Sequence, residues 1–448
     1  MKCCYIIVLC SIWITLLQGC QKYLGAKSSK SLTVPSTLID LQALLDEYLP
    51  VNTGVGAGML GGDEYYLTES RFNSLYTDIW RNMYVWADTN VFVGNANTWN
   101  GSYDNVYKAN TIIEVLPKIK QDASNEIEWD NVKGQALFLR GRCFFEVAMV
   151  WAEAYDAKNA KEKLGIPLRL GTDFNVPSVR SNLVDTYNQI ISDLRASIDL
   201  LPVKPVHVFR ASKPAACGEL ARVYLSMRMY DSAYLYANKA LELFNYLIDY
   251  NTLDTNATYP FTRFGPEVIY ETDIYGAYGP YNMVDTSIYR MFDNNDLRKA
   301  LYFEPNGDGS HKFCGNYNKN FDMFGGIATD ELYLIRAECL ARNGEPQLAL
   351  NDLNLLLKNR YLVGTYKNKQ SSNAETVLKW ILDERLKELL FRGLRWIDIK
   401  RYNKEGANIT LKRIIGSKEY ILPPNDLRYA MAIPQYIIEH SNIKQNPR

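Results

Sequence analysis

Few residues in the chain have the types and spacing that catalysis or metal binding requires. The three histidines, His207, His311 and His440, lie far apart, and none has a second ligand at metal-binding spacing. This distribution argues against a zinc site and against a catalytic centre built on histidine. We therefore predict surface or packing roles for all three residues.

Two groups of acidic residues invite a functional interpretation. Asp383, Glu384 and Glu388 could suggest the carboxylate pair of a glycosidase, but Glu384 and Glu388 share one face of a predicted helix. Glu388 also precedes Arg392 by four residues, the favourable order for an ion pair within a helix. The run 293–296 (Asp-Asn-Asn-Asp) could bind calcium through oxygen atoms, but it lacks the spacing of a dedicated loop and favours a turn or helix cap. We predict no cofactor and no metal, with a structural calcium ion left open.

The run 56–61 (Gly-Ala-Gly-Met-Leu-Gly) matches the glycine pattern of dinucleotide-binding turns. Such turns follow a buried strand, whereas the residues before this run include Pro50 and do not form a strand pattern. No alternation of strands and helices follows. The pattern therefore predicts no nucleotide site.

The first twenty residues have the features of a secretory signal. Lys2 provides the positive charge, and the apolar run from Tyr5 to Leu17 is too short to span a membrane as a stable helix. The run ends in Leu-Gln-Gly-Cys, which is similar to a bacterial lipobox with Cys20 as the lipidated residue. We predict a signal peptide over 1–19 and a lipidated tether over 20–31.

The remaining cysteines, Cys143, Cys217, Cys314 and Cys339, form no C-x-x-C motif. This spacing predicts neither a metal knuckle nor a redox dithiol. Cys143, Cys217 and Cys339 lie in helical patterns among Ala, Leu and Phe, where free cysteine acts as a small buried hydrophobe.

The composition excludes some classes of partner. Lys and Arg number 50, as do Asp and Glu, so the formal net charge is zero and nothing resembles a basic surface for nucleic acid. Aromatic residues make up 12% of the chain, and 32 of them are tyrosines. Tyrosine combines a flat apolar face with a hydroxyl group, which suits hydrated recognition surfaces.

Apolar residues recur at helical spacing through most of the mature chain, and we predict a mainly α fold. One helix is expected over 132–155 and a helix pair over 215–244, where small and bulky residues follow tetratricopeptide spacing. A similar pattern returns over 337–356. Because a long insert separates the copies, they are not tandem repeats of a solenoid.

The insert differs in kind from the helical segments. Residues 245–326 are dense in Tyr, Asn, Asp, Gly and Pro and predict long irregular loops with short strands. We therefore predict a single domain over 32–448, with a helical scaffold over 66–244 and 327–402, the excursion over 245–326, and a C-terminal tail over 403–448.

Several motifs in order resemble one family, the SusD/RagB outer-membrane lipoproteins of Bacteroidetes glycan uptake. The tail of the scaffold is the most specific part: 383–401 is similar to the family's "ER..EL..EG.RW.DL.R" ending, followed by Ile433-Pro434 and 445–447 (Gln-Asn-Pro). Trp99 to Asn110 is similar to its "W…Y…AN" helix, and 134–155 to its "GEA.FLRA..YF" helix. Most of these motifs concern the fold: we expect Trp396 to be a core anchor, Arg395, Asp398 and Arg401 to pair locally, and Trp99 to start a helix.

The resemblance implies a non-catalytic protein. It would be lipid-anchored to the outer membrane, facing outward, and would capture a glycan for a SusC-like TonB-dependent transporter. An alternative is peptide capture, as in RagB-like relatives, because a tyrosine-rich groove also suits extended peptides.

In the family, aromatic platforms on variable loops hold the sugar, because sugar C–H faces stack on aromatic rings while polar side chains bind the hydroxyl groups. Here the resemblance places these loops at 84–98 and 273–290. The candidates for ligand binding are Trp86, Phe92, Asn95, Asn97, Tyr275, Tyr278 and Tyr281.

Overall fold

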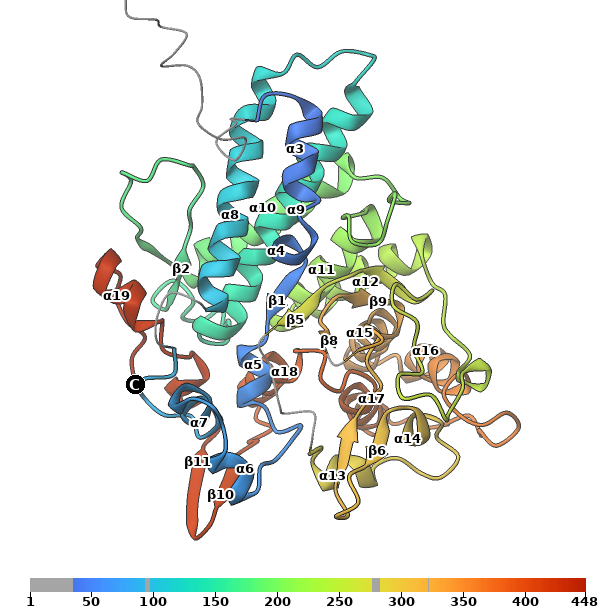
Figure 1. Ribbon diagram of the computed structural model, residues 1–448. Helices are drawn as coiled ribbons and strands as arrows, with labels where there is room; N and C mark the ends of the chain where they lie inside the picture. Colours follow the sequence, from blue (N-terminus) through green and yellow to red (C-terminus); the bar gives the residue numbers. More distant parts are fainter. Residues whose placement is uncertain (1–34, 93–96, 276–282, 321) are drawn as a thin grey trace, which may run out of the picture.

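The computed structural model describes residues 35–92, 97–275, 283–320 and 322–448. Helices form about half of these residues, and the strands are short and grouped in small sheets (Figure 1). The prediction of a mainly α fold is confirmed. In the part of the chain described, no helix is long and apolar enough to cross a membrane.

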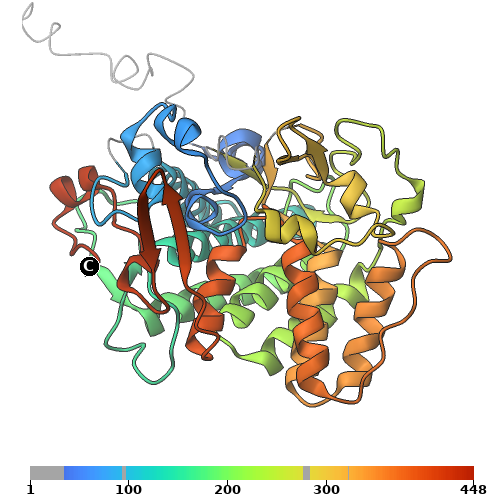
Figure 2. The same ribbon diagram turned by 90° about the horizontal axis from the view of Figure 1, so that it is seen from below.

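Eight longer helices form a continuous scaffold. Helix α9 packs against α8 and α10, α11 packs against α10 and α12, and α15 packs against α12, α16 and α17. The row continues across the molecule in Figure 2, which views it from below. The bounds are α8 (Thr98–Val115), α9 (Glu126–Trp151), α10 (Leu183–Leu200), α11 (Lys213–Ser226), α12 (Tyr230–Leu243), α15 (Thr329–Arg342), α16 (Pro346–Lys358) and α17 (Ala374–Glu388).

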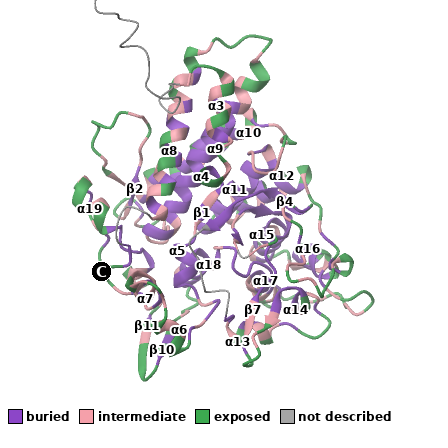
Figure 3. Cartoon of the chain, viewed as in Figure 1, coloured by how far each residue is buried: buried purple, intermediate pink, exposed green. Residues whose placement is uncertain are grey.

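Local sequence explains where these helices begin and which face they bury. The Asn182 side chain accepts a hydrogen bond from the backbone N–H of Asp185 and so caps α10. Leu183, Tyr187, Ile190 and Leu194 then follow at helical spacing, and all are buried. Helix α9 is instead buried on nearly all sides, because it is the central helix of its group (Figure 3).

The predicted helix pairs are confirmed. Helices α11 and α12 are joined by a short turn in which Arg228 has a φ of 61°, and α15 and α16 by a turn in which Gly344 has a φ of 80°. Ala221 and Ala233 are fully buried between α11 and α12, where their small side chains permit close helix packing. Their spacing in the sequence therefore predicted the close pairing of α11 and α12 correctly.

Shorter elements surround the scaffold. The N-terminal segment supplies α3 (Leu38–Leu45), α4 (Tyr48–Val51), β1 (Thr53–Val55), α5 (Ala57–Gly61), α6 (Glu69–Asn73) and α7 (Asp78–Tyr84). Strands β2 (Leu164–Pro167) and β3 (Arg180–Asn182) pair between α9 and α10. The tail supplies α18 (Arg395–Lys404), the hairpin β10 (Leu411–Ile415) and β11 (Lys418–Leu422), and α19 (Gln435–Ser441). Single turns of 3-10 helix in the described residues are η2 (Leu116–Lys118), η3 (Tyr250–Thr252) and η5 (Leu427–Tyr429).

The excursion contains short strands and turns, as its composition predicts. Its elements are β4 (Val268–Tyr270), β5 (Asp273–Tyr275), α13 (Thr286–Arg290), α14 (Arg298–Leu301), β6 (Phe303–Pro305), β7 (His311–Phe313) and β8 (Met323–Phe324), with β9 (Ile327–Ala328) leading into α15. Strand β5 lies between β1, to which it is parallel, and β8, to which it is antiparallel. The excursion is thereby tied to the N-terminal segment, and many of its aromatic residues form a second core cluster.

The glycine-rich run at 56–61 has a packing role. It forms α5, whose Gly58 and Gly61 lie against the buried ring of Trp396 on α18. A Cβ atom on Gly61 would lie 2.8 Å from the Trp396 ring and 3.0 Å from the Met431 methyl group. The absence of side chains therefore allows α5 to contact the tail closely.

This packing yields a prediction for stability. The substitution Gly61→Ala should lower the free energy of unfolding by about 1–3 kcal/mol, because the added methyl group overpacks a rigid buried ring. Gly101→Ala, on an exposed part of α8 with nothing within 4 Å, should be neutral or slightly stabilising. Urea unfolding measures both variants, and equal effects would contradict this account.

Buried ion pairs connect the C-terminal motif to distant segments. Glu388 accepts hydrogen bonds from Arg298 and Arg360, at 2.8 and 2.7 Å, whereas Arg392 pairs with Asp330. The predicted helical pair between Glu388 and Arg392 is therefore wrong, because α17 ends at Glu388 and the chain turns before Arg392.

The charged residues of the RW.D motif and its flank, at 395–401, pair only partly with neighbours in the sequence. Arg401 pairs with Asp398 at 2.8 Å, as predicted, but Arg395 pairs with Asp63, more than three hundred residues away. Trp396 is buried, which confirms its expected role as a core anchor.

The four cysteines Cys143, Cys217, Cys314 and Cys339 are free and buried. Burial raises the pKa of each thiol. Such thiols are protonated and unreactive in the folded protein.

Candidate functional site

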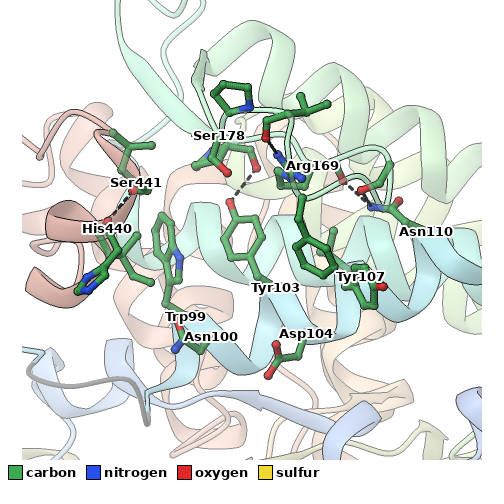
Figure 4. A pocket seen from close by; sticks show the side chains of 18 of the residues that line it. Trp99, Asn100, Tyr103, Asp104, Tyr107, Asn110, Arg169, Ser178, His440 and Ser441 are labelled. Atoms are coloured by element: carbon green, nitrogen blue, oxygen red, sulfur yellow. Dashed lines mark hydrogen bonds between the residues drawn. The ribbon is translucent and has the colours of Figure 1, made fainter. Parts of the chain in front are cut away.

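A groove of about 570 Å³ lies along one face of α8 (Figure 4). Its other walls are the loop 168–179, which connects β2 to β3, and the tail around α19. We call this cavity the α8 groove. Its size is in the range of small-molecule binding sites.

Aromatic residues at four-residue spacing line the helix side of the groove. Trp99, Tyr103 and Tyr107 follow one another along α8 at steps of about 6 Å, because the helix rises 1.5 Å per residue. Trp99 is buried, Tyr103 is half-buried, and Tyr107 is 41% exposed. Phe174 of the loop, 79% exposed, stacks on Tyr107 with a centroid distance of 5.1 Å. Tyr103, Tyr107 and Phe174 together form an aromatic surface, and Trp99 packs on Tyr103 at its buried end.

The loop 168–179 is fixed to α8 by hydrogen bonds. The Asn110 side chain donates to the carbonyl oxygens of Arg169 and Gly171, and the Tyr103 hydroxyl donates to the carbonyl of Pro167 at 2.7 Å. Glu114, one turn further along, accepts from the backbone and hydroxyl of Thr172. Helix α8 thus forms one side of the groove and also holds the loop that forms another wall.

Polar side chains rim the aromatic surface. Arg169 and Ser178 lie on the loop side of the rings, Asp104 lies on the opposite side, and His440 and Ser441 close one end (Figure 4). His440 stacks on Tyr436 with a centroid distance of 4.2 Å. The groove therefore combines ring faces with hydrogen-bonding groups, and it can bind a polyhydroxyl ligand without any chemical step.

The structure corrects two of the predicted ligand residues. Trp86 is 4% exposed: its indole N–H donates to the Gly61 carbonyl, and Arg413 lies over its ring at 5.3 Å. Phe92 is 7% exposed and packs on Trp151 at 5.3 Å. Neither ring presents a free stacking face, because residues distant in sequence cover them.

Asn97 caps α8, since its side-chain oxygen accepts from the backbone N–H of Asn100 at 3.0 Å. It therefore lies at the Trp99 end of the α8 groove. Tyr275 lies at the end of β5, with its backbone paired in register with Val55 of β1. Asn95, Tyr278, Tyr281 and the lipidation residue Cys20 lie outside the described residues. The structure does not bring Tyr275 and Asn97 to one cavity among those found in the part described.

The residues of the α8 groove were only partly accessible to sequence reasoning. The spacing of Trp99, Tyr103 and Tyr107 predicted a helix, and this is confirmed, but the same spacing also places three rings on one face. The opposite wall, including Phe174 and His440, carried no signal that could link it to α8.

The other candidates from the sequence have structural roles. Asp293 accepts hydrogen bonds from the backbone N–H groups of Asn295 and Asp296, which confirms the predicted turn. His207 packs on Phe209, and His311 stacks on Tyr289. Over the described residues, no three His, Cys, Asp or Glu side chains form a group that could hold a metal ion.

Comparison with protein families gives two matches. A model described as "Starch-binding associating with outer membrane" matches residues 22–225, and a model described as "SusD family" matches residues 329–436. Together the two models cover more than half of the chain. A comparison with curated proteins finds no match.

Solved structures share the fold. A putative sugar binding protein from Bacteroides vulgatus superposes with a TM-score of 0.75 at 22% identity, covering 93% of this chain and 99% of the other. A SusD superfamily protein from Bacteroides thetaiotaomicron gives a TM-score of 0.74 at 22% identity, covering 92% and 100%. A SusD-like carbohydrate binding protein from Bacteroides vulgatus gives 0.69 at 19% identity, covering 91% and 97%.

The two family matches lie in the expected order along the chain, and the neighbouring structures extend over nearly its full length. From the matched segments and the shared helical fold we conclude that the chain belongs to the SusD/RagB family.

Proposed function

We propose that the protein is a non-catalytic, cell-surface glycan-binding lipoprotein and that it binds oligosaccharide in the α8 groove. The observation that carries this proposal is the aromatic surface formed by Tyr103, Tyr107 and Phe174, with polar groups on both sides. Sugar rings stack on such faces while their hydroxyl groups take hydrogen bonds from the rim. Two proteins of similar structure, a putative sugar binding protein and a SusD-like carbohydrate binding protein, support the same function.

The groove favours a glycan over a peptide. Extended peptides are held largely through their main chain, which needs free backbone donors and acceptors. Here the carbonyl oxygens of Pro167, Arg169 and Gly171 already accept hydrogen bonds from Tyr103 and Asn110. These three carbonyl oxygens are thus already engaged within the protein. Peptide capture remains the alternative that the binding experiment below decides.

We further propose that Cys20 anchors the protein to the outer membrane and that it passes its ligand to a SusC-like TonB-dependent transporter. The lipobox and the outer-membrane description of the matching family model support the anchor. The chain between Cys20 and Pro35, where the described structure begins, spans at most about 50 Å when extended. An anchored protein would therefore stay close to the membrane, within reach of a transporter.

Aromatic truncation in the groove tests the proposal. Affinity electrophoresis of the lipid-free mature chain, in gels containing amylopectin, mannan, xyloglucan or galactan, should show retardation by at least one polysaccharide. Tyr107→Ala and Phe174→Ala should each weaken that binding about tenfold, because each removes one face of a stacked pair.

Tyr76→Ala provides the control, since Tyr76 is 89% exposed and lies outside the groove. Retardation that is unchanged by both groove variants would place glycan binding elsewhere. Tight binding of peptides in calorimetry, with no glycan signal, would overturn the proposed cargo.

A further inference from the structure

Asp104 lies at the edge of the α8 groove opposite the loop, and it has no partner in the described structure. It forms no hydrogen bond and no ion pair with a residue that the structure describes, although it lies on a helix rich in polar side chains. Burial raises the pKa of its carboxyl group, and the charge of Lys108 offsets this only in part. The residue is exposed, so its carboxylate can accept hydrogen bonds from a ligand beside the aromatic surface.

The nearest cation on α8 is engaged elsewhere. Lys108 lies four residues after Asp104, the spacing at which helical ion pairs form. Its ammonium group instead pairs with Glu47, at the start of α4. Asp104 is therefore left free to face a ligand.

The charged side chains on the loop side also have hydrogen-bond partners within the protein. Arg169 donates to the carbonyl oxygens of Val176 and Asp173, so its guanidinium group holds its own loop in shape. Glu114 binds Thr172, and the Asp173 carboxylate accepts from Asn175. Of the residues that line the groove, Asp104 is the one carboxylate and Arg169 the one guanidinium group. A carboxylate on a ligand would thus meet a like charge at the Asp104 edge.

We propose that Asp104 determines the ligand class of the α8 groove: it accepts hydrogen bonds from the hydroxyl groups of neutral saccharides, and it repels saccharides that carry carboxylates. This inference rests on the proposed function and makes it more specific. A carboxylate can accept from two neighbouring hydroxyl groups of one sugar while the ring face stacks on Tyr103 or Tyr107. A uronic acid at the same place would bring its carboxylate beside that of Asp104, and like charges repel.

Calorimetry of the lipid-free mature chain tests the inference with two sets of tetrasaccharides. The neutral set is maltotetraose, cellotetraose, mannotetraose and xylotetraose, and the anionic set is tetragalacturonate and tetramannuronate. The wild-type protein should bind at least one neutral tetramer, and it should bind both uronates more weakly. Asp104→Asn should weaken neutral binding about tenfold, because a charge-assisted hydrogen bond becomes a neutral one. Asp383→Asn, which changes an exposed carboxylate far along the chain on α17, should leave the affinity unchanged.

The possible results distinguish a failure of the role of Asp104 from a failure of the proposed glycan binding. If neutral tetramers bind and Asp104→Asn binds them equally well, or if wild type binds a uronate as tightly as a neutral tetramer, the role of Asp104 is overturned and glycan binding stands. If no tetramer of either set binds, both the proposed function and the inference are overturned. A circular dichroism spectrum of Asp104→Asn identical to that of wild type shows that a lower affinity of the variant does not come from a loss of folded structure.

Discussion

Replacing Arg360 by methionine should lower the free energy of unfolding by about 3–5 kcal/mol, as expected when one partner of a buried ion pair is removed. The Arg360 side chain is fully buried, and its guanidinium group donates to Glu388 at 2.7 Å, to Glu267 at 2.9 Å and to the Ile248 carbonyl at 2.8 Å. The same group lies 4.0 Å from the centre of the Tyr250 ring. Methionine fills the space but leaves both carboxylates without this cation.

The midpoint of urea unfolding measures the effect. Lys379→Met is the matched control, because Lys379 pairs with Asp383 on the exposed face of α17 and should contribute at most about 0.5 kcal/mol. A shift for Arg360→Met no larger than that of the control would show that the buried network does not stabilise the fold.

The second large effect depends on pH. Glu338 is fully buried and accepts from Arg401 at 2.6 and 2.7 Å and from Arg342 at 2.8 Å. Burial alone would raise the pKa of Glu338, but these two guanidinium groups outweigh it and lower the pKa from 4.5 to about 2. Because the folded pKa lies below the unfolded one, the pair stabilises the protein above pH 4.5, by about 3 kcal/mol. This stability is lost as the pH falls from 4.5 to 2.

The variant Glu338→Gln should therefore be less stable than wild type by about 3 kcal/mol at pH 7. Since glutamine does not titrate, the difference should shrink steadily below pH 4.5 and vanish near pH 2. Urea unfolding across this pH range measures the difference. A difference that stays constant down to pH 2.5 would contradict the assignment of acid sensitivity to Glu338.

Periodicity predicted the scaffold well, because helices and helix pairs are encoded locally. The small residues at Ala221 and Ala233 marked the α11 and α12 pair, and the structure confirms it. Partners that depend on tertiary contacts could not be predicted in this way. Arg395 pairs with Asp63 and Glu388 with Arg298 and Arg360, and no local pattern relates these positions.

The candidate site also combines features that local sequence predicts with features that depend on tertiary contacts. Trp86 was a candidate because the resemblance placed it on a ligand-binding loop, but Arg413 on β10 lies over its ring. The rings of the α8 groove were visible as a helical stripe, whereas the wall they face comes from the loop 168–179 and the tail around α19. Tertiary contacts decide which aromatic faces remain open, and these are not encoded in local spacing.

The four buried cysteines give the folded protein a set of internal reporters. Thiol reagents react with the thiolate, so Cys143, Cys217, Cys314 and Cys339 should be labelled only when the surrounding structure opens. Cys143 lies on α9, Cys217 on α11, Cys339 on α15 and Cys314 in the excursion. The labelling rate at each position, read by mass spectrometry, would therefore map the opening free energy of each part of the molecule, without any engineered probe.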